Sequence, residues 1–394
     1  MRIGLVSPYS LTAPGGVQGQ VLGLSRSLRA AGHDVRVLGP CDGAPPDPAV
    51  IPLGNSIPVE ANGSIATLAP DLPAQLRTIR ALWDEAFDVV NLHEPFAPSP
   101  PATALLIEDA PLVGTFHAAG TSAAYRHLGP LLRWGAAKLA VRVAVSRDAR
   151  TLAAATIGGR WELLFNGVEV ERFAKATPHP TDRPTILFVG RHEPRKGLAQ
   201  LLEAVAGLRE DLAVWVASEG PQTAELRARY GGDRRVEWLG RISDEELASR
   251  LRGADVLCAP SLGGESFGVV LLEAMAAGTA VVASDLPGYR NAARPGRDAL
   301  LSPPGDSEAL AAALSRALHE PGLAAELIGA GEARAQAFSM DHLAERYLEL
   351  FERCIATRGA GPPSRWVRYR PGTAAVGSDR GRAGGDGPVD SPFV

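Results

Sequence analysis

Cysteine is scarce in this chain, with three residues among 394. Cys41, Cys258 and Cys354 lie far apart, and no C-x-x-C pair occurs. A zinc site needs clustered ligands and a disulfide framework needs more thiols, so neither is predicted. A reducing, cytoplasmic environment fits this cysteine usage best.

Long apolar runs and an excess of one charge are also lacking. The 40 basic and 44 acidic residues give a formal charge of −4, which offers no reason to expect a nucleic-acid partner. No stretch of about twenty uncharged apolar residues occurs, so no transmembrane helix is predicted. The N-terminus runs directly into a strand-like segment, without the apolar region of a signal peptide.

The chain does contain a repeated alternation of short apolar runs with longer amphipathic segments. This alternation is typical of parallel strands with helices on both faces of the sheet. Five runs in the first half predict buried strands at residues 2–6, 34–38, 88–92, 112–116 and 140–145. A second set follows at residues 185–190, 212–217, 236–240, 254–260 and 280–284.

The two sets of strands predict an α/β fold of two doubly wound, Rossmann-like domains that face each other across a cleft. Because such sheets bind ligands at the carboxyl ends of their strands, the cleft is the expected active site. In the C-terminal region, R-W-V-R-Y-R is either a sticky part of a disordered tail or a patch that contacts membrane or phosphate. The predicted boundaries are 1–172 for the first domain, 173–184 for a proline-rich hinge, 185–340 for the second domain, 341–358 for a C-terminal helix and 359–394 for a disordered tail.

A cluster of cations follows the first strand of the second set. Gly190 and Arg191 come directly after this strand, and Arg195 and Lys196 precede a glycine that opens a helix. Fixed cations at a strand end, beside a helix N-terminus, suit a diphosphate. Solvated loop charges are the ordinary alternative for such residues, but their place at this edge of the sheet favours a binding site.

Two acids stand in the glycine-bracketed apolar segment G-G-E-S-F-G-V-V-L-L-E-A-M-A-A-G, residues 263–278. Residues 266–277 are predicted to form a helix that Gly278 ends. Glu265 and Glu273 would then lie about 12 Å apart along the helix axis. One ligand atom cannot contact both carboxylates, but an extended nucleotide sugar can.

These motifs carry a family resemblance. E-S-F-G-V-V-L-L-E is similar to the E-x7-E element of retaining glycosyltransferases with two Rossmann-like domains, the GT-B type. Over residues 1–355, further motifs resemble, in order, those of the actinobacterial phosphatidylinositol mannosyltransferases. They are S-P-Y at 7–9, P-G-G-V-Q at 14–18, A-N-G-S at 61–64, H-E-P at 93–95, G-T-F-H at 114–117, A-V-S at 144–146, N-G-V at 166–168 and G-R-H-E-P-R-K-G at 190–197.

The resemblance implies that the second domain binds the nucleotide sugar and the first binds the acceptor. Arg191 and Lys196 resemble the pair that holds the donor diphosphate. Glu265 resembles the acid that contacts the transferred hexose, and Glu273 the acid that accepts from the ribose hydroxyls. His117 resembles the histidine beside the sugar. The donor site would also include Gly15 and Gly16 of a phosphate loop, Ile242, Asp244, Ser266, Phe267 and Gly268.

The nucleotide base and the acceptor are predicted from fewer residues. Asp244 could accept from the paired N–H donors of guanine, which favours GDP, although Ser243 and Glu246 also form a capping box that would explain an acid at this helix start. Around the acceptor's inositol ring, the residues that match the family are Tyr9, Gln18, Asn62 and Ser64.

The lipid side of the acceptor site departs from the family. Thr67 and Ser122 stand where the mannosyltransferases carry cations, and the candidate interfacial helix at 72–86 offers two arginines, Arg77 and Arg80. We therefore expect only weak peripheral contact with the cytoplasmic face of a membrane.

The resulting prediction is a retaining glycosyltransferase that moves a hexose, mannose from GDP-mannose, to a phosphatidylinositol-like lipid or a small polyol. No metal or cofactor is implied, because no Asp-x-Asp element accompanies the sugar-binding loop. Within the same class, a UDP-sugar-dependent transferase acting on an inositol phosphate and a nucleotide-sugar epimerase stay open. A dehydrogenase is disfavoured because no G-x-G-x-x-G follows a strand, and a non-catalytic nucleotide-sugar binding protein because acids, histidine and cations are all present.

Overall fold

The computed structural model describes residues 1–61, 64–107, 110–118, 125, 128–208 and 210–359. The first part of the chain forms a seven-stranded sheet in which every pair of neighbours is parallel. The spatial order of its strands is β3 (Val50–Pro52), β2 (Asp34–Gly39), β1 (Arg2–Val6), β6 (Val89–His93), β7 (Leu112–Phe116), β8 (Val141–Ala144) and β9 (Glu162–Leu163).

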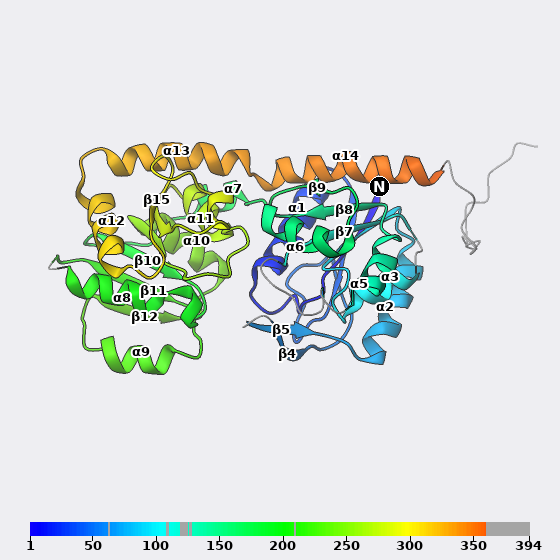
Figure 1. Ribbon diagram of the computed structural model, residues 1–394, viewed down its shortest axis with the longest axis horizontal. Helices are drawn as coiled ribbons and strands as arrows, with labels where there is room; N and C mark the ends of the chain where they lie inside the picture. Colours follow the sequence, from blue (N-terminus) through cyan, green and yellow to red (C-terminus); the bar gives the residue numbers. More distant parts are fainter. Residues whose placement is uncertain (62–63, 108–109, 119–124, 126–127, 209, 360–394) are drawn as a thin grey trace, which may run out of the picture. The chain divides into compact units, whose positions relative to one another are not determined.

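The second part forms a six-stranded sheet, also parallel throughout (Figure 1). Its order is β12 (Val236–Gly240), β11 (Ala213–Ala217), β10 (Thr185–Val189), β13 (Val256–Ala259), β14 (Ala280–Ser284) and β15 (Leu300–Ser302). In both sheets the chain moves outward in one direction, then returns to the middle and continues in the other. This is the Rossmann order, and the two α/β domains predicted from the sequence are confirmed.

All ten predicted strands are present, with ends within one or two residues of the expected ones. The sequence did not identify β3, β9 and β15, which have only two or three residues each, nor the antiparallel pair β4 (Ile57–Ala61) and β5 (Ser64–Leu68). Strands β3, β9 and β15 could not be recognised from the sequence, because two or three residues are too few to show a hydrophobic periodicity.

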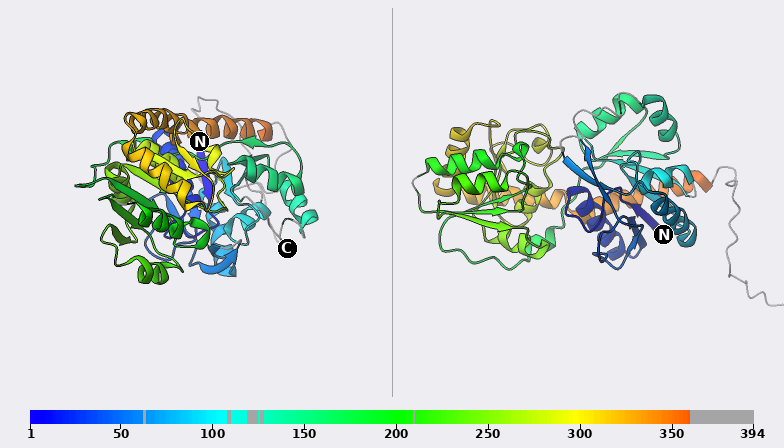
Figure 2. Two further views of the ribbon diagram at one scale, coloured as in Figure 1. Left: turned by 60° about the vertical axis from the view of Figure 1, so that its left-hand side comes forward. Right: turned by 90° about the horizontal axis from the view of Figure 1, so that it is seen from below.

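Helices cover both faces of each sheet (Figure 2). Those of the first domain are α1 (Gly16–Ala30), α2 (Leu72–Glu85), α3 (Pro100–Ile107), α5 (Gly129–Ala136) and α6 (Arg147–Ile157). The short helix α7 (Val170–Ala174) packs instead into the core of the second domain, through Val170 and Phe173. Around the second sheet lie α8 (Leu198–Gly207), α9 (Thr223–Tyr230), α10 (Asp244–Gly253), α11 (Val269–Ala276), α12 (Ser307–His319) and α13 (Leu323–Ala337). Residues 175–184, within the predicted hinge, contain neither helix nor strand.

The C-terminal helix α14 (Met340–Gly359) returns to the first domain, where it packs beside α1 (Figure 1). Tyr347, Leu350 and Phe351 of α14 share a buried core with Ile3 and Leu5 of β1. The predicted tail, including R-W-V-R-Y-R, lies outside the described residues. The three cysteines are free and buried, and no described helix is long and apolar enough to cross a bilayer.

Candidate active site

The cations that follow β10 are held by a buried acid that the sequence analysis did not single out. Glu193, 6% exposed, pairs with Arg191 at 3.2 Å through one carboxylate oxygen and with Arg195 at 3.0 Å through the other. Gly197 has a φ of 71°, and a Cβ there would lie 1.9 Å from the carbonyl oxygen of Pro260. Only glycine therefore fits this turn, which sets Lys196 at the end of a short 3-10 helix, Pro194–Lys196.

Lys196 and Glu265 are in direct contact. The Lys196 Nζ atom lies 2.6 Å from Glu265 Oε1, and an Arg195 guanidinium nitrogen lies 3.5 Å from the same oxygen. The Ser261 hydroxyl donates to Glu265 at 3.0 Å and contacts the Tyr289 hydroxyl at 2.9 Å. The structure thus brings together the diphosphate-binding lysine and the hexose-binding acid of the sequence prediction.

The contact lies where a Rossmann sheet binds its ligand. Lys196 follows β10 and Glu265 follows β13, and these adjacent strands lie on either side of the point at which the order of the sheet reverses. Ligands bind at the carboxyl ends of the strands beside such a switch point. The first domain has the same arrangement, because Gly15 and Gly16 follow β1, while His93 ends its neighbour β6 and Glu94 follows it.

The helix predicted at 266–277 begins later than expected, at Val269. Gly268 has a φ of 89°, in the left-handed region, and this turn separates Glu265 and Ser266 from the helix. Glu265 is therefore a loop residue and does not lie directly before the N-terminus of α11. Phe267 is 1% exposed and stacks on Phe165, so its ring belongs to the core.

Glu273 lies on α11 and is half-buried. Burial raises the pKa of its carboxyl to about 7, Arg172 opposes the rise, and Asp244 and Glu169 add to it. Asp244 pairs with Arg172 at 3.2 Å and keeps 75% of its side chain exposed. Asp244 opens α10, as the capping alternative expects, and Ser243 caps this helix by accepting from the Glu246 amide at 3.1 Å. Ile242, just before the cap, is half-buried.

His117, 8% exposed, follows β7 and contacts a second histidine. Its Nε2 atom lies 2.9 Å from His93 Nδ1. Glu94 accepts from the backbone amides of His117 and Ala118 at 2.5 and 2.6 Å. Burial lowers the pKa of His117 to about 3, so this imidazole is neutral at physiological pH.

Three of the residues predicted to bind the acceptor, Tyr9, Gln18 and Ser64, are described, and all three belong to the first domain. Burial, together with Glu94, raises the pKa of Tyr9, and the Gln18 side chain donates to the Ser10 carbonyl at 3.3 Å. Ser64 opens β5, and Asn62 lies outside the described residues. The α1 helix starts after Gly15 without a side-chain cap, so its first amides are available to an anion. Among the described residues, no hydrogen bond or ion pair joins this group to Lys196 or Glu265.

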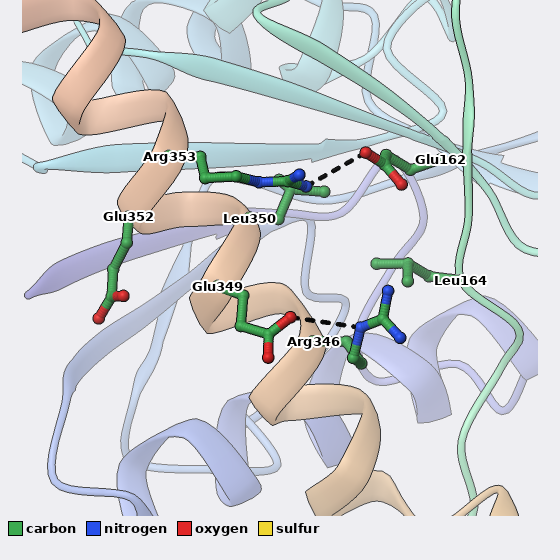
Figure 3. A pocket seen from close by; sticks show the side chains of 7 residues that line it. All are labelled: Glu162, Leu164, Arg346, Glu349, Leu350, Glu352 and Arg353. Atoms are coloured by element: carbon green, nitrogen blue, oxygen red, sulfur yellow. Dashed lines mark hydrogen bonds and ion pairs between the residues drawn. The ribbon is translucent and has the colours of Figure 1, made fainter.

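Two cavities border α14. One, of about 370 Å³, contains none of the predicted site residues, and four of its charged side chains form two ion pairs, Arg353–Glu162 at 3.1 Å and Arg346–Glu349 at 3.5 Å (Figure 3). The other is much smaller and is bordered by His93, His117 and Tyr347. In the described part of the chain, no group of three or more histidine, cysteine or acidic side chains could hold a metal ion.

Sequence reasoning missed several residues of this site. Glu193 and Glu94 stand inside motifs that carried the resemblance, G-R-H-E-P-R-K-G and H-E-P, but their roles depend on burial. Glu94 also has a φ of 48°, rare for a residue other than glycine and typical of functional sites. Ser261 and Tyr289 carried no signal, since they reach Glu265 only through the fold.

Comparison with known proteins identifies the family. Residues 14–172 match Glycosyltransferase Family 4 and residues 169–334 match the Glycosyl transferases group 1 family. The phosphatidyl-myo-inositol mannosyltransferase of Mycobacterium leprae is 40% identical over 374 residues, which cover 91% of this chain and 98% of that protein. The chain belongs to the phosphatidyl-myo-inositol mannosyltransferase family. It is therefore a glycosyltransferase, and the resemblance found in the sequence is confirmed.

Solved structures agree on the fold. Sucrose-phosphate synthase from Thermosynechococcus elongatus superposes with a TM-score of 0.72 at 23% identity, covering 90% of this chain and 99% of that one. The Anabaena protein HepE in complex with UDP-glucose gives a TM-score of 0.69 at 19% identity, covering 90% and 100%. Both are similar to this chain across its two Rossmann-like domains, which confirms the GT-B assignment.

Proposed function

We propose that the protein transfers mannose from GDP-mannose to a phosphatidylinositol-like acceptor with retention of anomeric configuration. The observation that carries the proposal is the contact of Lys196 with Glu265 at the switch point of the second sheet. A cation for the departing diphosphate and an acid for the hexose stand side by side, as cleavage of a sugar–diphosphate bond requires. The names of the curated relatives support mannose and the inositol lipid.

In this mechanism the protein acts mainly by electrostatics. Negative charge grows on the diphosphate as the sugar leaves, and Arg191 and Lys196 stabilise it. Glu193 holds Arg191 and Arg195 in place and offsets part of their positive charge. The cations of this loop therefore repel one another less while no donor is bound. The acceptor hydroxyl attacks on the face from which the diphosphate departs and passes its proton to the leaving phosphate. Because the cations are part of the chain, we propose that no metal ion is required.

The base is assigned to guanine on weaker grounds. The exposed carboxylate of Asp244 is available to the paired N–H donors of guanine, while Arg172 holds it from one side. Uracil has no such pair of donors. A UDP-sugar donor is the alternative, and it would leave Asp244 with only its role at the start of α10.

Contact with a lipid surface is proposed through apolar rather than basic residues. On α2, Leu72, Leu76 and Trp83 are 64%, 57% and 62% exposed. Both arginines of this helix are engaged, because Arg77 donates to the Leu53 carbonyl at 3.3 Å and Arg80 pairs with Asp84 at 3.2 Å. Exposed aromatic and aliphatic side chains insert at the membrane interface without needing anionic lipid.

A donor panel tests the proposal. Release of nucleoside diphosphate would be measured with GDP-mannose, GDP-glucose, UDP-glucose and UDP-N-acetylglucosamine, each with and without phosphatidylinositol vesicles. We expect rapid release only with GDP-mannose and the lipid together. Turnover with a UDP-sugar would establish the alternative donor, and tight binding of a nucleotide sugar without turnover on any acceptor would indicate a binding protein.

A further inference from the structure

A row of buried polar side chains lies behind His117 and extends to the C-terminal helix. His93 and Asn91 stand on β6, Thr115 on β7 and Tyr347 on α14, and none is more than 2% exposed. The contacts form a continuous chain. From α14 they are Tyr347 hydroxyl to Thr115 Oγ1 at 3.1 Å, Thr115 Oγ1 to Asn91 Oδ1 at 2.7 Å, Asn91 Nδ2 to His93 Nε2 at 3.4 Å and His93 Nδ1 to His117 Nε2 at 2.9 Å.

This chain of hydrogen bonds has a direction from donors to acceptors, and Asn91 sets it. An amide oxygen only accepts and an amide nitrogen only donates, so Thr115 donates to Asn91 and Asn91 donates to His93 Nε2. His93 Nε2 therefore carries no hydrogen. Burial lowers the pKa of His93 well below its usual value, so the ring is neutral and its single hydrogen is on Nδ1.

The direction continues into the site. His93 Nδ1 donates to His117 Nε2, which consequently carries no hydrogen either. Neutral His117 must then hold its hydrogen on Nδ1. Among the described residues, Nδ1 of His117 has no hydrogen-bond partner, so this N–H is free for a ligand.

We propose that His93 is a positioning residue that fixes His117 as the Nδ1–H tautomer, with Asn91, Thr115 and Tyr347 holding His93 in turn. The expected effect on turnover rests on the proposed function, whereas the assignment of the His117 tautomer does not. The C-terminal helix thereby becomes part of the scaffold of the active site, although it follows the second domain in sequence.

The fixed tautomer suits transfer of a sugar. An uncharged N–H can donate to a hydroxyl or phosphate oxygen of the donor without placing a positive charge beside the anomeric carbon, where positive charge accumulates in the transition state. A freely rotating or wrongly protonated imidazole would present a lone pair instead and lose the contact. Small losses of position at a reacting centre cost on the order of a hundredfold in rate.

The tautomer can be read directly by NMR of the full chain labelled with ¹⁵N-histidine at pH 7. Two-bond ¹H–¹⁵N correlations distinguish Nδ1–H from Nε2–H, and the variants His93→Phe and His117→Phe assign the two rings by loss of signals. We expect both histidines as Nδ1–H tautomers. Finding either one as the Nε2–H tautomer would overturn the proposal, because it would reverse the direction of the chain.

A matched pair of variants tests whether the chain of hydrogen bonds from Tyr347 to His117 matters for turnover. Thr115→Val interrupts it, whereas Thr185→Val removes an equally buried strand hydroxyl that bonds to the Arg183 carbonyl at 2.8 Å, outside the site. We expect Thr115→Val to give mixed His117 tautomers and a kcat about tenfold to a hundredfold lower, with KM for the donor within about twofold. Thr185→Val should change neither. Equal loss of kcat in both variants, or an unchanged tautomer and kcat in Thr115→Val, would refute the role of the chain.

The two proposals fail in different ways. If wild-type protein turns over no GDP-mannose, the proposed function is wrong, but the NMR spectrum still decides the tautomer. If turnover is normal and the spectrum shows Nε2–H, the proposed function stands and the positioning role of His93 does not.

Discussion

Replacing Lys196 with alanine separates the chemistry of the site from its stability. In the proposed mechanism Lys196 contributes one charged donor to the diphosphate, and loss of one such donor typically lowers kcat by about a hundredfold to a thousandfold, or roughly 3–4 kcal/mol of transition-state stabilisation. The folded protein should be affected less, since Glu265 keeps Arg195 at 3.5 Å and the Ser261 hydroxyl at 3.0 Å. We expect a loss of stability of no more than about 1.5–3 kcal/mol, the usual contribution of one hydrogen bond to a charged group.

The assay is kcat from the initial rate of mannose transfer, with thermal unfolding measured in parallel. Lys175→Ala is the matched control, because Lys175 is 77% exposed and, within the described part of the chain, its ion pair is with Glu171 on the surface of α7. Its kcat should stay at the wild-type value. Near-normal turnover in Lys196→Ala, or an equal loss in Lys175→Ala, would show that the diphosphate is not held here.

Three further predictions follow from the donor acids and from α2. Glu265→Gln should abolish most transfer but leave affinity for free GDP almost intact, whereas Glu273→Gln should weaken GDP binding; calorimetry would contradict this if both lost affinity equally. Affinity for GDP should also fall as pH drops below about 7, because protonation removes the negative charge of the Glu273 carboxylate and weakens the hydrogen bonds that it would accept from the ribose, and this dependence should be absent in Glu273→Gln. Trp83→Ala should reduce co-sedimentation with phosphatidylcholine vesicles severalfold, and binding that depends on salt and anionic lipid instead would refute apolar insertion.

The sequence was sufficient for the architecture. Ten of the strands were predictable because each is a short, mostly apolar run, and the alternation of these runs with helices favours parallel sheets. Positions directly after β10 and β13 were predictable as site residues for the same reason. The carboxyl ends of parallel strands meet at one edge, so residues of both loops were expected to border the ligand, but the direct contact of Lys196 with Glu265 was not predicted.

Residues whose roles depend on tertiary contacts could not be predicted. Glu193 reads as one more loop charge until its burial between Arg191 and Arg195 is seen. The start of α11 shifted because the backbone of Gly268 is left-handed, which composition does not reveal. Likewise, Tyr347 is 230 residues from His117 in sequence, and only the return of α14 to the first sheet connects them.

The central claim, retaining transfer of mannose to an inositol lipid, is tested most directly by the structure of the product. Purified protein would be incubated with GDP-α-mannose and phosphatidylinositol vesicles, and the isolated lipid examined by ¹H and ¹³C NMR. Our account predicts a single mannose joined to the inositol ring through an α linkage. A β-linked product would contradict retention. The absence of any mannosylated lipid, while GDP is released and mannose is transferred to another acceptor, would contradict the assigned substrate.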